Sequence, residues 1–354
     1  MDSLIRFFKG KRILITGHTG FKGSWLTFIL KQAGADVAGY ALPPITEVSH
    51  FDLLGLKKEI LHTEGDIRDF SKLNDLFQSF KPEIVFHLAA QALVRESYSD
   101  PRTTFETNVM GSVNLLQAVH LSDSIKTLVY ITSDKCYENV EWVWGYREID
   151  QLGGHDPYSA SKASAELVFS SYLRSFFLKK KDFGAASARA GNVIGGGDWS
   201  VDRIIPDCIR AVTTNGKIIL RNPNATRPWQ HVLEPLSGYL TLAKNLSEDP
   251  KKFSSAWNFG PSTQKVRTVY EVSRSIIDSL GKGEIIIDQS HDKVHEAHLL
   301  QLNCDKAHQY LNWYPRWSVD QTLEATASWY KHYMEGGDIR EKTKEQIEKY
   351  FSND

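Results

Sequence analysis

A tyrosine and a lysine four positions apart, Tyr158 and Lys162, are the first candidates for chemistry in this sequence. Pro157 suits the first turn of a helix, and a spacing of four places both side chains on one helical face. A tyrosine that acts as a base near neutral pH needs its pKa lowered from about 10 to about 7, which requires about 4 kcal/mol of preferential phenolate stabilisation. The ammonium group of a nearby lysine can supply part of this stabilisation. A lone Tyr-x-x-x-Lys is more often a surface pair, so the surrounding sequence must decide whether this pair is functional.

That setting includes Ser133, which follows an apolar run at 126–131 that is typical of a buried strand. Ligands of open α/β sheets bind at the carboxyl ends of the strands. Ser133 is therefore expected near Tyr158, with its hydroxyl available to hydrogen-bond a substrate hydroxyl.

A second candidate site follows the first predicted strand, at 12–16. Gly17, Gly20 and Gly23 lie between this strand and a helix predicted at 24–33. Glycines at such a junction let the backbone approach a pyrophosphate, whose charge the helix N-terminus stabilises. The spacing is Gly-x-x-Gly-x-x-Gly rather than Gly-x-Gly-x-x-Gly, and a plain tight turn is the alternative. The flanking strand and helix favour a dinucleotide site.

The elements that must position these residues alternate between strand and helix, which predicts an α/β fold: a Rossmann-type doubly wound parallel sheet. Further strands are expected at 35–42, 60–64, 83–88 and 185–190, and further helices at 71–80 (capped by Ser71), 101–121 and 157–179. From about residue 190 the elements become shorter. We therefore predict a Rossmann domain at 1–190 and a smaller mixed α/β C-terminal substrate lobe at 191–335, with segments crossing back. The charged tail at 336–354 is predicted to be a solvated helix, with partner binding as the alternative.

Composition narrows the function classes. The 42 basic and 43 acidic side chains nearly cancel, so no bulk field favours nucleic acid or an anionic membrane. Cys136, Cys208 and Cys304 include no CxxC pair, which indicates neither a disulfide framework nor a zinc site. The longest charge-free run, 107–122, is too short to span a bilayer. The first eleven residues lack a signal-peptide core, so a cytoplasmic location is expected.

Longer strings in the sequence resemble the extended short-chain dehydrogenase/reductase family. Within it, the chain is similar to the nucleotide-sugar 4,6-dehydratases, and most of all to the branch that acts on CDP-glucose. The similarity covers about residues 10–333 and is carried by the glycine loop, Asp66-Ile67, His87-Leu-Ala-Ala90, Ser133, Tyr158 and Lys162, and more specifically by Gly20-Phe-Lys-Gly-Ser-Trp25, Thr132-Ser-Asp-Lys-Cys-Tyr137, Arg189-Ala-Gly-Asn-Val-Ile-Gly-Gly-Gly-Asp-Trp199 and Arg227-Pro-Trp-Gln-His-Val232.

The resemblance implies an internal redox reaction on one nucleotide sugar, in deoxysugar biosynthesis such as that of lipopolysaccharide O-antigen. Tyr158 takes the C4 hydroxyl proton while hydride leaves C4 for NAD. The resulting ketone acidifies C5–H, the C6 hydroxyl departs with a proton from Asp134, and hydride returns to C6. Lys135 stands where related dehydratases have a glutamate base. It acts as the C5 base if it is neutral, or it steadies the enolate charge.

The resemblance also implies ligand contacts. NAD would be held by Gly17, Thr19, Gly20, Phe21, Lys22, Gly23, Tyr40, Asp66, Ile67, Leu88, Ala89, Ala90, Thr107, Tyr158 and Lys162. The nucleotide sugar would be held by Asn108, Asn192, Arg203, Arg221, Arg227 and His298. Planar guanidinium groups suit phosphate oxygens, although Arg203 and Arg221 are alternatively surface residues.

Some of these contacts have alternatives. The second strand ends at Tyr40 rather than at an acidic residue, so the preference for NAD over NADP rests on the resemblance. Asp66 is expected to flank the adenine or to cap a turn. The pair His295 and His298 lacks further ligands, and no metal is expected. Relatives pair two long helices per subunit, which implies a homodimer or homotetramer. A 4-epimerase and a non-catalytic dinucleotide sensor are the rival functions.

Overall fold

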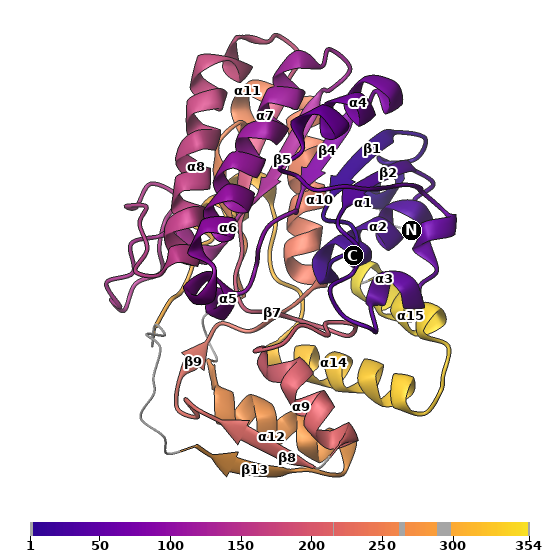
Figure 1. The fold of residues 1–354 in the computed structure, drawn as a ribbon, viewed down its shortest axis with the longest axis vertical. Coiled ribbons are helices and arrows are strands. Elements are labelled where there is room, and N and C mark those ends of the chain that lie inside the picture. The colour runs from indigo at the N-terminus through magenta and orange to yellow at the C-terminus, as the bar shows by residue number, and fades with distance from the viewer. Residues whose placement is uncertain (1–2, 215, 262–265, 289–298, 353–354) are drawn as a thin grey trace.

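The computed structural model describes residues 3–214, 216–261, 266–288 and 299–352. Its centre is a seven-stranded, fully parallel sheet with helices on both faces (Figure 1). The strands are β1 (Arg12–Thr16), β2 (Asp36–Ala41), β3 (Leu61–Glu64), β4 (Ile84–His87), β5 (Thr127–Ile131), β6 (Gly184–Arg189) and β11 (Ala256–Asn258). Their order is β11-β6-β5-β4-β1-β2-β3, which is the Rossmann order with one strand added beyond β6. The predicted fold class is confirmed.

Two hydrophobic cores cover the two faces of this sheet. Ile13 and Ile15 of β1 point into one core, whereas Leu14 points into the other. The first core contains α2 (Phe21–Gln32) and α10 (Leu233–Glu248), and the second contains α4 (Phe70–Phe80) and α8 (Pro157–Ser175). Strands buried on both faces read as continuous apolar runs, which is why the sequence revealed them.

Local capping differs from the prediction at α4. The carboxylate of Asp69, not the hydroxyl of Ser71, accepts a hydrogen bond from the Lys72 backbone N–H at 3.0 Å. The cap therefore lies two residues earlier than expected, and the helix begins at Phe70. An aspartate at N-cap satisfies one of the backbone donors that a helix start leaves unpaired.

The long helix expected at 101–121 is present, but its middle turn is wider. It consists of α6 (Pro101–Phe105), a π-helical turn η2 (Glu106–Met110) and α7 (Gly111–Leu121). Such turns occur often at functional sites. Thr107 and Asn108, both predicted site residues, lie in this turn.

The smaller lobe follows β6 and is visible at the bottom of Figure 1. Its parallel pair, β8 (Lys217–Leu220) and β13 (Glu284–Ile287), is accompanied by α9 (Ile204–Thr213) and α12 (Val269–Leu280). Two further pairs join β7 (Val193–Ile194) to β10 (Gln230–His231) and β9 (Thr226–Arg227) to β12 (Arg267–Thr268). The chain crosses back through α10 and β11, which belong to the large sheet and its cover. The division near residue 190 stays a prediction.

Short elements complete the described chain. They are α1 (Ser3–Arg6), α3 (His50–Leu53), η1 (Leu56–Lys58), α5 (Val94–Ser99), η3 (Asp134–Cys136), η4 (Phe177–Lys179), α11 (Pro250–Phe253) and α13 (Asp305–Leu311). Two helices then end the fold, α14 (Val319–Met334) and α15 (Ile339–Phe351).

The charged tail is a helix, as expected, but it is not simply solvated. One side of α15 is buried, and Tyr350 donates a hydrogen bond to the buried Glu234 carboxylate at 2.6 Å. Arg340 reaches the carbonyl of Leu54, just beyond α3, at 2.6 Å, and Figure 1 shows α15 beside α3. The apolar residues buried on this side are Ile339, Ile347, Tyr350 and Phe351.

Candidate active site

Two cavities of about 400 and 390 Å³ meet at the carboxyl end of the large sheet. Tyr158, Ser133, Lys22 and Arg203 line both cavities. The cavity of about 400 Å³, called here the cofactor cavity, is lined by every residue predicted to hold the cofactor. The other, called here the substrate cavity, is lined by Asp134, Lys135, Asn192, Arg203, Arg221 and Arg227. The topology thus brings residues from distant parts of the chain to one place.

The glycine loop is tightly packed below the cofactor cavity. Gly17 has a left-handed φ of +74°, and a Cβ there would lie 2.7 Å from the Ala89 backbone nitrogen. A Cβ on Gly23 would lie 2.1 Å from the Gly17 carbonyl oxygen. No side chain caps the start of α2 at Gly20. Uncapped N–H groups beside a cavity suit a pyrophosphate, so the residues present fit a dinucleotide.

The part of the cofactor cavity where the adenosine is expected contains an ion pair that the sequence did not predict. Both carboxylate oxygens of Asp66 accept hydrogen bonds from the Arg68 guanidinium, the shortest at 2.7 Å from Nη2. This contact with Arg68 lowers the pKa of Asp66. Asp66 also accepts from the Arg68 backbone N–H at 2.8 Å, which is the turn cap considered as the alternative. Tyr40 is buried and donates to the Asp66 carbonyl at 2.9 Å.

Tyr158 and Lys162 lie near the N-terminus of α8. The carboxylate of Asp156 caps this helix, and Ser97 Oγ accepts a hydrogen bond from the Tyr158 backbone N–H at 3.1 Å. Lys162 Nζ lies 6.0 Å from the centre of the Tyr158 ring. The local helix therefore presents both side chains to the cofactor cavity, as their spacing predicted.

The electrostatics of this pair differ from the expectation. Burial raises the pKa of Tyr158 to about 12, although the hydrogen bond with Ser133 opposes this rise. Burial, together with the charge of Lys22, lowers the pKa of Lys162 to about 8. The chain alone therefore does not make Tyr158 acidic. A further positive charge beside the phenol is needed for it to act as a base near neutral pH.

Ser133, Asp134 and Lys135 occupy the end of β5 and the short helix η3. Ser133 Oγ donates to Asp134 Oδ1 at 2.9 Å, and Asn192 Nδ2 donates to Asp134 Oδ2 at 3.4 Å. Asp134 is buried, whereas Lys135 is half-buried at the substrate cavity. Among the residues that the structure describes, no carboxylate forms an ion pair with Lys135.

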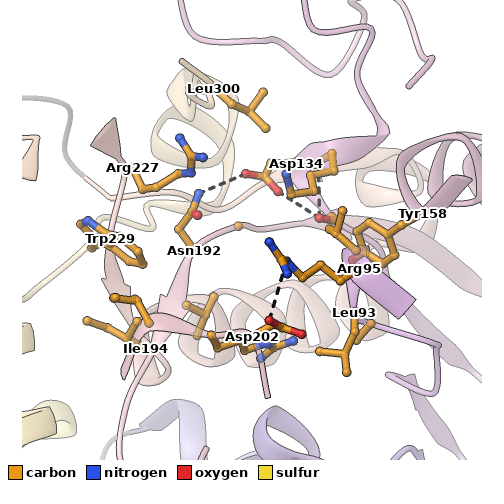
Figure 2. A pocket seen from close by; sticks show the side chains of 18 of the residues that line it. Leu93, Arg95, Asp134, Tyr158, Asn192, Ile194, Asp202, Arg227, Trp229 and Leu300 are labelled. Carbon is orange, nitrogen blue, oxygen red and sulfur yellow. Dashed lines mark hydrogen bonds and ion pairs between the residues drawn. The ribbon is translucent and has the colours of Figure 1, made fainter. Parts of the chain in front are cut away.

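Arginines gather on the far side of the substrate cavity. Arg203 pairs with Asp198 at 3.0 Å, and Arg221 pairs with Asp202 at 3.1 Å. Arg95, which the sequence did not single out, extends from α5 toward Asp202, and their closest atoms are 3.7 Å apart (Figure 2). Its position after the fourth strand, where ligands of such sheets bind, was the signal that could have found it.

Asn108, one of the predicted substrate residues, does not line this cavity. Asn108 lines neither cavity, because its amide is occupied within a buried network: it donates to Ser161 Oγ at 2.9 Å and accepts from the Gln91 N–H at 2.9 Å. Its predicted role in substrate binding stays a prediction, and its contacts in this structure anchor the loop after β4. His298 lies outside the described residues.

Within the described ranges, no three His, Cys, Asp or Glu side chains cluster in a way that could hold a metal ion. None of the helices in these ranges has the length and apolar character to cross a membrane.

Comparisons with known proteins agree on one family. The family model described as GDP-mannose 4,6 dehydratase matches residues 14–326. The CDP-glucose 4,6-dehydratase of Salmonella typhimurium is 49% identical over 350 residues, covering 98% of each protein. An epimerase from Methanothermobacter thermautotrophicus has a similar structure, with a TM-score of 0.79, 24% identity and 96% of both chains covered. DesIV, a dTDP-glucose 4,6-dehydratase from Streptomyces venezuelae with NAD and TYD bound, gives a TM-score of 0.76, 22% identity, and 92% and 98% coverage.

Proposed function

This chain belongs to the GDP-mannose 4,6 dehydratase family, and we propose that it is a CDP-glucose 4,6-dehydratase. The reaction would convert CDP-glucose to CDP-4-dehydro-6-deoxyglucose and water, with NAD as internal redox carrier. The family resemblance expected from the sequence is thereby confirmed. The choice of CDP-glucose rests on the relative that shares 49% identity over nearly the whole of both proteins.

One observation carries the proposal: a buried carboxylic side chain, Asp134, lines the substrate cavity next to Ser133, which together with Tyr158 lines both cavities. Oxidation at C4 requires only Tyr158 and its neighbours. Loss of the C6 hydroxyl also requires a proton donor placed at the sugar. A 4-epimerase has no use for such a donor, and a non-catalytic sensor has no use for the set as a whole.

In the first step, Tyr158 would take the proton of the C4 hydroxyl, and Ser133 would orient that hydroxyl. When bound, NAD⁺ would accept the hydride from C4, return it to C6, and place a positive ring charge beside Tyr158. Lys162 contributes a second positive charge. These charges offset the burial that raises the pKa of Tyr158.

In the second step, Asp134 would protonate the departing C6 hydroxyl as the C5 proton is removed. The electrons of the C5–H bond form the C5–C6 double bond, and water leaves. When hydride returns to C6, C5 takes up a proton, which gives the 4-keto-6-deoxy product. Two roles fit Lys135 at this point. A neutral amine would accept the C5 proton, whereas an ammonium would hold the enolate charge.

The arginines of the substrate cavity would bind the nucleotide diphosphate. Arg203, Arg221 and Arg227 come from the smaller lobe, and Arg95 faces them from the Rossmann side. Guanidinium groups pair well with phosphate oxygens, and their number suits a ligand with two negative charges. Arg203 and Arg221 would exchange the carboxylates of Asp198 and Asp202 for phosphate as the ligand enters.

The assay for this proposal is a substrate panel. The protein is incubated with CDP-, dTDP-, GDP- and UDP-glucose, and the alkaline absorbance of the 4-keto product is followed. Turnover of CDP-glucose well above the others is expected. A preference for a sugar with another nucleobase would contradict the choice of CDP-glucose but not the dehydratase activity. Formation of C4-epimerised sugar without ketone would show that the protein is an epimerase instead.

We also propose a homo-oligomer, a dimer or a tetramer, in the cytoplasm. Met110, Leu121, Leu167 and Phe176 are exposed on η2, α7 and α8 or directly after it, and these helices pack side by side. Exposed apolar side chains on adjacent helices suit pairing with a second copy. The three cysteines are free and buried, as in a reducing compartment. The product would enter deoxysugar biosynthesis, including that of lipopolysaccharide O-antigen.

A further inference from the structure

Behind the active site lies a buried ion pair to which the proposed mechanism gives no role. Glu166 of α8 and Arg189 of β6 are both almost fully buried, and their closest oxygen and nitrogen lie 2.8 Å apart. Arg189 donates to Glu166 through both Nε and Nη2, at 3.0 and 2.8 Å. Ser187 adds a third hydrogen bond to the carboxylate, at 2.9 Å. A buried pair with this many hydrogen bonds has a fixed geometry.

The pair contacts both ends of the segment 132–137, which carries Ser133, Asp134 and Lys135. At its start, the hydroxyl of Thr132 donates to Glu166 Oε1. At its end, Arg189 Nη1 donates to the hydroxyl of Tyr137 at 2.7 Å, and the guanidinium carbon lies 4.9 Å from the centre of the Tyr137 ring. Tyr137 in turn donates to Asn258 Oδ1 of β11 at 2.8 Å.

Glu166 also stands one helical turn beyond Lys162 and two turns beyond Tyr158 on α8. The same ion pair is therefore connected to the helix that carries the base and to the segment that carries the acid. Tyr158 is fixed by α8 itself, whereas Asp134 and Lys135 lie on a short 3₁₀ turn with little regular structure of its own.

We propose that Tyr137 is a positioning residue: held by Arg189, it keeps Asp134 and Lys135 in place for the elimination step. This inference rests on the proposed function. It predicts that the two chemical steps depend on Tyr137 unequally. Thr132, at the opposite end and next to Ser133, would support both steps, while Tyr137 would support chiefly the second. A displacement of about 1 Å is enough to cost about a hundredfold in rate.

The test uses Tyr137→Phe, which keeps the ring over Arg189 and removes only the hydroxyl. Substitution of Glu166 or Arg189 would leave a buried charge without its partner and risk misfolding, so those variants are avoided. Tyr130→Phe is the matched control. Tyr130 is equally buried, lies on β5 and donates to Ser112, and its ring packs against Phe169 in the opposite core.

Wild type and both variants are mixed with CDP-glucose. Nicotinamide absorbance reports the first step, and 4-keto product together with C5 exchange in deuterated solvent reports the second. In Tyr137→Phe, product formation should fall about tenfold to a hundredfold. The first step should change less than about threefold, so reduced nicotinamide should accumulate. Tyr130→Phe should keep the wild-type ratio of the two rates, whatever it costs in thermal stability.

A wild-type product rate in Tyr137→Phe would overturn the inference, and so would an equal fall of both steps, which is the mark of general loosening. Failure of the proposed function would look different. In that case wild-type protein would itself show neither nicotinamide reduction nor ketone with any of the nucleotide sugars.

Discussion

The carboxylate of Asp134 fills the space that a side chain at position 191 would need. A Cβ on Gly191 would lie 1.8 Å from Asp134 Oδ2 and 2.1 Å from its Cγ. Asn192, the next residue, adopts a left-handed φ of +52° and donates to the same carboxylate oxygen. The turn after β6 therefore leaves room for the carboxylate of Asp134, which follows the neighbouring strand β5.

Gly191→Ala tests this packing. The added methyl must displace the Asp134 carboxylate, because the nearest atoms of other residues are those of that side chain. We expect product formation to fall about a hundredfold, since an acid moved by about 1 Å no longer meets the departing hydroxyl. The ketone assay measures this, and circular dichroism checks the fold. Unchanged turnover would show that Asp134 does not need its present position.

Gly260→Ala is the control for that substitution. Gly260 is also buried and follows β11, but a Cβ there would meet its nearest atom, of Leu302, at 3.3 Å. A small adjustment accommodates it, and most of the activity should remain. Equal losses in the two variants would point to a general effect of glycine replacement near the site.

Asp134→Asn should separate oxidation from elimination. The amide keeps the shape of the side chain but supplies no acidic proton to the C6 hydroxyl. The variant should still reduce nicotinamide when mixed with CDP-glucose, yet release little ketone. Tyr158→Phe should show neither signal, with turnover lower by about 10²–10⁴ because the base is gone. If Asp134→Asn binds substrate and fails to reduce nicotinamide, Asp134 acts in the first step instead.

The alkaline limb of the pH profile should reflect Lys162. Its pKa is lowered to about 8, chiefly by burial and further by the charge of Lys22, so the ammonium loses its proton as the pH rises through that value. We expect kcat/KM to decline there rather than near 10. In Lys22→Met the repulsion is removed, the pKa of Lys162 rises, and the limb should move to higher pH. A limb that stays in place or moves down would contradict this coupling.

Acid should destabilise the protein through His50. This side chain joins α2 to α15, with Nδ1 2.9 Å from Ser24 Oγ and Nε2 3.3 Å from Thr343 Oγ1. Burial lowers its pKa from 6.5 to about 3. Between these values the unfolded chain binds a proton that the native protein does not, so the free energy of unfolding falls as the pH falls. The slope from one histidine is about 1.4 kcal/mol per pH unit.

His50→Gln should therefore be less stable at neutral pH but lose less stability on acidification. Urea unfolding at pH values from about 6 down to about 5 measures both slopes. A variant with the wild-type slope would show that His50 does not account for this share of the acid sensitivity.

The sequence predicted most of the large domain because its signals are local. Buried parallel strands appear as apolar runs, and glycines or prolines mark the starts of α2, α6 and α8. The extent of α15's burial was missed because its apolar residues are few and its partner, Glu234, is more than a hundred positions away. No pattern in the tail alone indicates that contact.

Site residues that belong to a sequence motif could be predicted. Site residues that reach the cavity only through three-dimensional packing could not. Tyr158, Ser133 and the glycine loop follow from spacing and strand ends. Arg95 stands in no recognised string, and Asp202, which lies 3.7 Å from it, is far away in the sequence. The buried contacts of Asn108 could not be predicted either, since its position next to Thr107 says nothing about which side of the π-helical turn it occupies.

The most direct test of the proposed function follows one hydrogen atom. The protein is incubated with CDP-glucose that carries deuterium at C4, and the product is examined by NMR and mass spectrometry. An internal 4,6-dehydration moves the label from C4 to C6, so the account predicts a 4-ketone with deuterium in its new methyl group. Recovery of sugar with the label still at C4, inverted or not, or a ketone without label at C6, would contradict it.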